Sequence, residues 1–189
     1  MTSFPPQDIR AFLTCCAGEW LALRSRFALD AADRSIGGEA TRLGDEGGDA
    51  WHEAERGELL VTYLEPQLEG EPGGLAITPP ASGHGQLPVR QLIFSAGGRF
   101  HSAPESPAEE GKGERQEEGS WELRPDGSLE LTIQAGAVVV KERIRFTKPN
   151  LRLRSSVEHR ADGRPGRVRF SSEIRRVSPP KEPTAAPSA

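Results

Sequence analysis

The sequence predicts a mainly β protein, an antiparallel up-and-down β-barrel with a short N-terminal helix. Short runs of alternating apolar and polar residues recur along the 189 residues, as expected for strands that bury one face. Turn-forming pairs such as Asp126-Gly127 separate these runs, which favours sequential hairpins. We expect eight or more strands, and closure into a barrel removes the exposed edges that an open sheet would have.

The N-terminal part of the chain supplies the helix and the first strands. Residues 7–17 follow a Pro-Pro pair and predict an amphipathic helix, because apolar residues recur at helical spacing: Ile9, Phe12, Leu13 and Cys16. Residues 20–29 alternate and predict a strand with Leu21, Leu23, Phe27 and Leu29 on one face and Ala22, Arg24 and Arg26 on the other. Residues 30–57, rich in glycine and charge, predict a flexible loop before a strand at 58–64.

The C-terminal part predicts a series of hairpins. After a turn-rich break and a proline-dense loop, a strand is expected at 89–94, and the charged segment 102–119 predicts a second flexible loop. Asp126-Gly127 then joins two alternating runs, and strands at 137–146, 151–159 and 167–177 follow. Residues 1–177 are therefore expected to form a single barrel domain, and residues 178–189 a disordered tail.

Charge and cysteine content exclude several classes of function. A net charge of −4 and a pI near 5.7 argue against binding a nucleic acid or an anionic membrane surface, because both bind positively charged protein surfaces. No apolar run approaches the length of a membrane span and no signal pattern begins the chain, so a cytoplasmic location is expected. The adjacent Cys15 and Cys16 are expected to be reduced, and no metal-ligand or catalytic-triad spacing is present.

One segment, residues 142–156, carries the candidate site. Glu142 interrupts an apolar strand face formed by Val138, Val140, Ile144 and Phe146. Past the turn, Arg152, Arg154 and Ser156 share a face of the next strand. Two interpretations remain open: a structural ion pair that makes a buried carboxylate tolerable, or a ligand site in which guanidinium groups bind carboxylates. Strand pattern alone favours neither.

Whether these side chains share one surface depends on the length of the hairpin loop. If Phe146 pairs with Leu151, Glu142 faces the interior and both arginines face solvent. If Phe146 instead faces Arg152, then Glu142, Arg152, Arg154 and Ser156 line one surface. The sequence leaves both registers open.

These residues carry a resemblance to a known family. The segments KERIRFTKPNLRLRSS and FSSEIRRVS are similar to the C-terminal signature of the S-type phycobiliprotein lyases (CpcS/CpeS type). Residues 8–25, with Gly18, Trp20 and Arg24, resemble the family's N-terminal block, and the DGSLELTI hairpin is similar as well. The likeness covers residues 8–29 and about 119–178, whereas the middle of the chain departs from the family pattern.

The resemblance implies a fold and an activity. Family members resemble lipocalins and fatty-acid-binding proteins, bind a linear tetrapyrrole (a bilin, such as phycocyanobilin or phycoerythrobilin), and attach it through a thioether to a cysteine of a phycobiliprotein α or β apo-subunit. For this chain it implies a carbon–sulfur bond-forming lyase with Glu142 as the catalytic group and Arg24, Arg152, Arg154 and Ser156 as bilin-binding residues. No metal or tightly bound cofactor is expected, and the partners would include the apo-subunit and either a second copy or a related lyase subunit.

Two other classes of function stay open. The chain departs from the family after Arg24, where it has Arg26, Phe27 and Ala28, which suits a non-catalytic bilin carrier or a partner subunit of a heteromeric lyase. A generic lipocalin-like binder of a hydrophobic acid would use two arginines in a barrel equally well.

Overall fold

The computed structural model describes residues 4–29, 52–78, 89–103 and 118–177. Within these residues the chain forms one helix, α1 (Ile9–Cys16), and ten strands. The strands are β1 (Gly18–Ala28), β2 (His52–Leu64), β3 (Gly73–Thr78), β4 (Arg90–Ser95), β5 (Arg99–Ala103), β6 (Glu118–Leu123), β7 (Leu129–Ala135), β8 (Val138–Lys148), β9 (Leu151–His159) and β10 (Pro165–Arg175).

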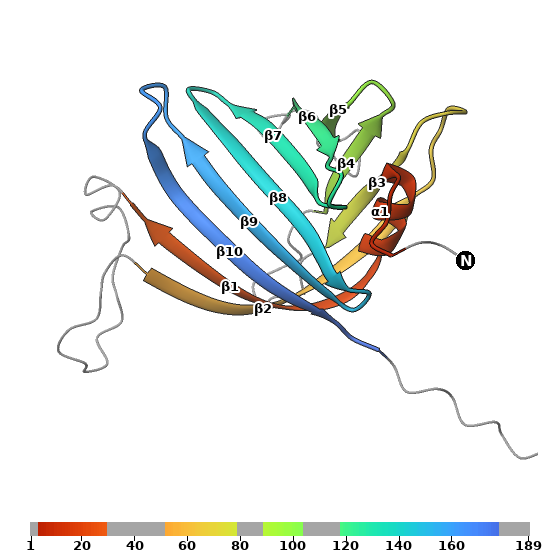
Figure 1. The fold of residues 1–189 in the computed structure, drawn as a ribbon, viewed down its shortest axis with the longest axis horizontal. Helices are drawn as coiled ribbons and strands as arrows, with labels where there is room; N and C mark the ends of the chain where they lie inside the picture. Colours follow the sequence, from red (N-terminus) through yellow and green to blue (C-terminus); the bar gives the residue numbers. More distant parts are fainter. Residues whose placement is uncertain (1–3, 30–51, 79–88, 104–117, 178–189) are drawn as a thin grey trace, which may run out of the picture.

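The described strands close into one antiparallel barrel in the order β1-β10-β9-β8-β7-β6-β5-β4-β3-β2. Each strand pairs with its neighbour along the chain, and β1 closes the barrel by pairing with both β2 and β10. Figure 1 shows β8, β9, β10 and β1 as long strands lying side by side, with the short strands β3 to β6 beyond them. The predicted up-and-down barrel with a short N-terminal helix is therefore confirmed.

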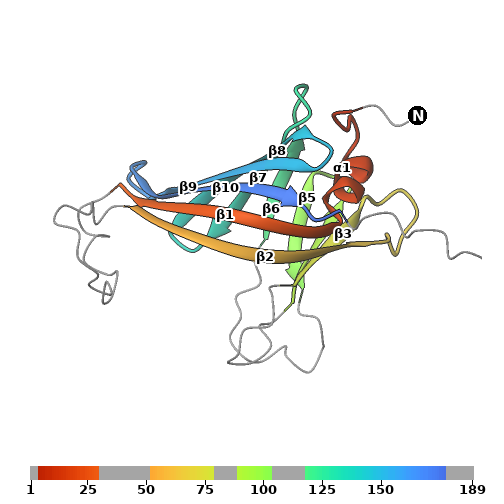
Figure 2. The ribbon, with the colours of Figure 1, turned by 90° about the horizontal axis from the view of Figure 1, so that it is seen from below.

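The helix α1 covers one end of the barrel. The Asp8 side chain caps it by accepting a hydrogen bond from the backbone N–H of Ala11 at 2.8 Å. Phe12 and Leu13 are fully buried, and the ring of Phe12 meets that of Phe146 edge-on at 5.2 Å. The helix lies beside β3 in both views (Figures 1 and 2), and its packing closes the apolar core at this end.

The core occupies one side of the barrel interior. It combines α1 with inward residues of β1 to β8, and its buried members include Trp20, Val61, Phe94, Leu131 and Ile144. On β1 the inward residues are Trp20, Ala22 and Arg24, whereas Leu21 and Leu23 face outward. The leucine face of this strand therefore lies on the outside of the barrel, and the face that bears arginine lies inside.

The predicted hairpins at Asp126-Gly127, at residues 147–150 and after residue 159 are present, and Gly127 adopts a φ of 75° that a turn glycine accepts readily. Three expectations need correction. Strand β2 begins at His52, within the segment 30–57 expected to be a loop. Alternation in its first part was hidden by charged side chains that pair across to β1.

Strand β3 lies where the sequence indicated a turn and a loop. Its start, Gly73-Gly74, has the composition of a turn, yet a Cβ added at Gly73 would lie 2.4 Å from the backbone oxygen of Leu64. At Gly74 it would lie 2.6 Å from that of Leu92. These glycines serve close strand approach. The expected loop at 102–119 is also shorter than predicted, because residues 102–103 end β5 and residues 118–119 begin β6. Residues 30–51 and 104–117 of the two expected loops, and the expected tail at 178–189, lie outside the described residues.

None of the described helices is long and apolar enough to cross a membrane. The free cysteines, Cys15 and Cys16, form no disulfide with each other. Cys16 is buried in the core, and burial raises the pKa of its thiol, which keeps the thiol protonated.

Candidate functional site

Polar side chains gather on the inner wall formed by β8, β9, β10 and β1. The strand register arranges them in three adjacent rows. The row nearest α1 contains Phe146, Arg152, Glu173 and Ala22; the middle row contains Ile144, Arg154, Ser171 and Arg24; the third contains Glu142, Ser156, Arg169 and Arg26. All five residues proposed from the sequence, Glu142, Arg24, Arg152, Arg154 and Ser156, therefore lie on one wall.

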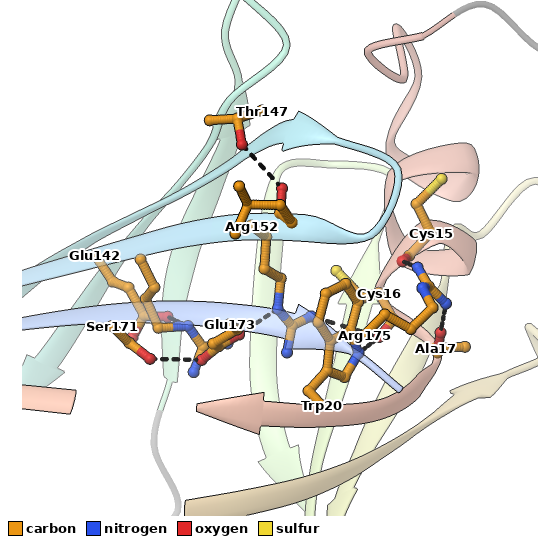
Figure 3. Close-up of polar contacts among 12 residues, drawn as sticks. Cys15, Cys16, Ala17, Trp20, Glu142, Thr147, Arg152, Ser171, Glu173 and Arg175 are labelled. Carbon is orange, nitrogen blue, oxygen red and sulfur yellow. Dashed lines mark hydrogen bonds and ion pairs between the residues drawn. The ribbon is translucent and has the colours of Figure 1, made fainter. Parts of the chain in front are cut away.

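A β-bulge in the β8–β9 hairpin produces this arrangement. Lys148 pairs with Leu151 across a two-residue turn, but the next pair is Phe146 with Arg152, so Thr147 is an extra residue on β8. The Thr147 hydroxyl donates to the backbone oxygen of Leu151 at 3.3 Å (Figure 3). Of the two registers left open by the sequence, the structure has the one in which Glu142 and the arginines share a surface.

Glu142 pairs with Arg154 across the two strands. Arg154 Nε lies 3.0 Å from Glu142 Oε1, and the two side chains are 25% and 16% exposed. The geometry is that of an ion pair without a hydrogen bond, and the Arg154 Nε–H has no acceptor among the described residues. A buried donor without an acceptor is costly, so this group is well suited to bind an acceptor from a ligand.

Arg152 lies deeper, beneath α1 (Figure 3). Its Nε donates to Glu173, and both side chains are only 1% exposed. Its guanidinium also stacks on the ring of Trp20, 4.2 Å from the centroid, and reaches the backbone oxygen of Cys16 at 3.4 Å. Arg152 therefore joins the barrel wall to the C-terminal end of α1.

Arg175 holds the same end of α1 from the other side of Trp20. It donates to the backbone oxygens of Cys15, at 2.6 Å, and Ala17, and its guanidinium lies 4.5 Å from the Trp20 centroid. Two cations near the last carbonyls of a helix oppose the negative end of its dipole. The Trp20 indole adds a hydrogen bond to the oxygen of Cys16 at 2.9 Å, so the last turn of α1 is bound on several sides.

The charges on this wall reinforce one another. Burial alone would raise the pKa of Glu173, but the nearby Arg154 and Arg152 outweigh it and hold that pKa below its ordinary value. Burial likewise opposes the charge of Arg154, yet Glu142 and Glu173 raise the pKa of this guanidinium above its ordinary value. Both groups are charged at neutral pH.

Arg24 occupies the middle row, separated from Arg154 by one strand that carries Ser171. It lies 3.7 Å from Glu55 of β2 and is 29% exposed. Gly57 makes room for it, because a Cβ there would lie 2.9 Å from an Arg24 Nη atom. Because β10 lies between the strands that carry Arg24 and Arg154, the backbones of these two residues are about 10 Å apart, given strand spacings near 5 Å.

The third row and the wall beyond it contain further ion pairs. Arg26 lies 3.1 Å from Glu55, and Glu158 lies 3.6 Å from Arg167 and 3.5 Å from Arg169. Arginines outnumber carboxylates in these pairs, so the described part of the wall suits an anionic ligand. No group of three metal-ligating side chains occurs among the described residues.

Sequence reasoning missed Glu173. Like Glu142, Glu173 is a glutamate within an alternating strand, and that pattern could have identified it. One face of β10 carries Ser171, Glu173 and Arg175, and the other carries Phe170, Ser172 and Ile174. The apolar residues were the natural choice for the interior, and the structure places them outside.

Comparisons with known proteins agree with this architecture. Residues 109–176 match the family described as CpeS-like protein. A curated relative, Chromophore lyase CpcS/CpeS 1 of Paulinella chromatophora, is 35% identical over 94% of this chain and 93% of its own length. Among solved structures, the S-type phycobiliprotein lyase CPES from Guillardia theta superposes with a TM-score of 0.60 at 16% identity, covering 92% of this chain and 95% of that chain, which shows a shared fold.

Proposed function

Since the chain belongs to the CpcS/CpeS family of chromophore lyases, we propose that it binds a bilin inside the barrel and promotes thioether attachment of that bilin to a cysteine of a phycobiliprotein α or β apo-subunit. The observation that supports this most directly is the inner wall, where two guanidinium groups and a carboxylate face the interior from three strands. Bilins carry two propionates and a row of pyrrole nitrogens, which such a wall complements in charge.

In this proposal Arg24 and Arg154 bind the propionates. Guanidinium groups form charge-assisted, often forked hydrogen bonds with carboxylates. The Arg154 Nε–H still lacks an acceptor, and a propionate oxygen would supply one. Ser156, directly opposite Glu142, adds a neutral donor at the far side of the site.

Glu142 takes the role of proton partner for the tetrapyrrole. Its carboxylate accepts hydrogen bonds from pyrrole N–H groups and stabilises a protonated ring system, which makes the ethylidene carbon more electrophilic. The thiolate of the acceptor cysteine forms the new C–S bond at that carbon, and a proton adds to the neighbouring ring carbon, so S–H adds across the double bond without a leaving group. The chain itself supplies no nucleophile.

Arg152 has a different role from the one that the family resemblance implies. It is buried and bound to Glu173, Trp20 and Cys16, so we assign it to holding α1 against the wall that carries Arg154. Its contribution to bilin binding is then indirect, through the position of its neighbours.

The test is a reconstitution. The purified chain is mixed with phycocyanobilin or phycoerythrobilin and with one apo-subunit, and the α and β apo-subunits are tested in separate reactions. Each product is denatured before its absorption is recorded. We expect colour that stays with the acceptor after denaturation, and none when the acceptor cysteine is replaced by serine. A chain that leaves the acceptor uncoloured with every bilin and subunit would contradict the activity.

A non-catalytic carrier is the second candidate, favoured by Arg26. This residue, at the departure from the family pattern, faces inward and pairs with Glu55, the same carboxylate that Arg24 approaches. A carrier would bind bilin with a clear spectral change but transfer it only after a related lyase subunit is added. The same reconstitution distinguishes the two functions.

A further inference from the structure

An apolar patch lies on the outside of the barrel wall that bears the site. Five large side chains on adjacent strands β1, β10 and β9 point outward: Leu21, Leu23, Leu153, Phe170 and Ile174. Each is between 43% and 56% exposed. We call these five residues the outer patch. Contiguous exposed apolar side chains on a soluble fold mark sites of interaction more often than isolated ones do.

The strand register makes the outer patch continuous. Leu21 pairs with Ile174, and Ser172 lies directly between Leu23 and Leu153. A groove of about 470 Å³ runs through the patch, and Leu23, Leu153 and Phe170 line it. The patch thus has both the apolar surface and the concavity that a protruding apolar side chain of a partner requires.

One edge of the groove is basic. Arg143 and Arg145 of β8 also line it, and Lys141 continues the same outward row. Arg143 is engaged by Asp126 at 2.6 Å, but Arg145 has no ion-pair partner among the described residues. In a chain with net charge −4, this row is a local reversal of sign.

The opposite edge of the patch carries mixed charge. On β2 the outward residues Arg56 and Glu58 pair with Leu23 and Leu21 of β1. A second copy of the chain would therefore offer no uniformly acidic edge to meet Lys141, Arg143 and Arg145. A different protein with carboxylates beside an apolar surface fits better.

We propose that the outer patch and Arg145 form the docking surface for the acceptor protein subunit, through an apolar surface of that subunit edged by carboxylates. This inference rests on the proposed function. The groove and the bilin site are the two faces of the same strands, since Leu153 precedes Arg154 in β9 and Phe170 precedes Ser171 in β10. A subunit docked there would be held against the wall that binds the chromophore.

The experiment compares surface variants in binding and in transfer. Leu153→Ser with Phe170→Ser removes the centre of the patch, and Arg145→Glu reverses the charge at its edge. Matched controls are Leu68→Ser, at an exposed position between β2 and β3, and Arg99→Glu, at an exposed position on β5. The melting temperature and the spectrum of bound phycocyanobilin are measured for each variant before any acceptor is added.

We expect the patch variants to bind phycocyanobilin with the wild-type spectrum. The concentration of apo-subunit that gives half-maximal transfer should rise about tenfold or more, with the rate at saturation unchanged, because docking is weakened and the chemistry is not. Added salt should weaken docking of the wild type more than that of Arg145→Glu. Both controls should behave as the wild type does.

If both patch variants reach half-maximal transfer at the same apo-subunit concentration as the wild type, the outer patch is not the docking surface. So would a change of oligomeric state, seen by light scattering, together with unchanged transfer, since the patch would then bind a second copy. Failure of the proposed function is distinguishable: a wild-type chain that binds no bilin contradicts the site, whereas its affinity for the apo-subunit, measured without bilin, still tests the docking surface.

Discussion

Two neighbouring ion pairs, each with its arginine on β9, differ chiefly in how deeply they are buried in the barrel. Arg152 with Glu173 and Arg154 with Glu142 start from residues two apart on the same face. The first pair is 1% exposed at both members and lies under α1 and Trp20. The second is 25% and 16% exposed and keeps a donor without an acceptor. The same pair of residue types therefore serves two purposes on one wall.

The difference in burial between the two pairs distinguishes a structural role from a ligand-binding role. Among the described residues, Arg152 also keeps a donor without an acceptor, its Nη2, but both members of its pair are only 1% exposed and are enclosed by the helix end and the indole. A pair that is still open to the interior, with an unmet donor, can exchange its partner for a ligand carboxylate. Family likeness alone treats Arg152 and Arg154 as equivalent.

The largest expected effect is the loss of the buried pair. Arg152→Ala leaves the carboxylate of Glu173 without its closest partner, which should lower the free energy of unfolding by about 3 to 5 kcal/mol. Arg154→Ala should cost about 1 kcal/mol or less, as for a partly exposed pair. Chemical denaturation measures both, and equal losses would contradict the distinction between the pairs.

A double variant sharpens the same test. Arg152→Met with Glu173→Leu removes both buried charges, and stability should return towards that of the wild type, because no uncompensated charge remains. If stability returns and bilin affinity is retained, Arg152 acts only as support. A restored fold that no longer binds bilin would instead show that Arg152 contacts the chromophore.

Glu142→Gln should act mainly on transfer. The substitution keeps the shape and most hydrogen-bonding capacity, so we expect a stability loss of about 1 kcal/mol or less. The long-wavelength absorption of bound bilin should shift towards the unprotonated form, and transfer should slow by about 10²-fold, as for loss of a positioned acid-base group. Normal transfer with an unaltered spectrum would exclude the proton role, and a loss of about 3 to 5 kcal/mol with an unaltered spectrum would favour a structural pair.

Arg154→Ala and Arg24→Ala should weaken bilin binding by about 1 to 3 kcal/mol each, the range for losing a charge-assisted hydrogen bond. The matched control is the bilin dimethyl ester, whose propionates carry no charge. If the arginines bind propionates, the ester should bind the variants and the wild type with similar affinity. An equal loss of affinity for the free acid and the ester would show that these arginines act elsewhere.

The smallest effect concerns pH. The pKa of Glu173 lies below its ordinary value because of Arg154 and Arg152, so the folded state binds this proton less readily than the unfolded state does. Its stabilisation is therefore complete above the ordinary glutamate pKa of 4.5 and is lost as pH falls through the lowered folded value. As pH is lowered from about 6, the melting temperature of the wild type should fall more steeply than that of Glu173→Gln.

The barrel could be predicted from sequence because its signals are local. Alternation over a few residues and a turn such as Asp126-Gly127 identify a hairpin without knowledge of the rest of the chain. Strand β3 escaped prediction because Gly73 and Gly74 serve close backbone approach, and nothing in the local sequence distinguishes that use from a turn.

The site could be predicted only in part, because its residues were identified and their depth was not. Glu142, Arg152 and Arg154 share one wall only because an odd number of residues connects Phe146 to Arg152. The alternation of apolar and polar residues within each strand cannot reveal that number. The enclosure of Arg152 depends on α1 and Trp20, far away in sequence. Long-range packing of this kind has no signature within a single strand.

The bulge at Thr147 also bears on how this hairpin can change in evolution. Lys148 pairs with Leu151 and Phe146 with Arg152, so Thr147 is skipped by the pairing. A deletion of this one residue would leave each of those partners unchanged and give a regular hairpin. A deletion of one residue within Pro149-Asn150 also leaves four residues between Phe146 and Arg152, so the arginines stay on the inner wall, but the two-residue turn that joins Lys148 to Leu151 is lost. When two relatives differ by one residue here, an alignment gap placed at the bulge keeps Lys148 and the turn residues beside their equivalents, whereas a gap placed in the turn shifts Lys148, and the inner arginines stay aligned in both cases.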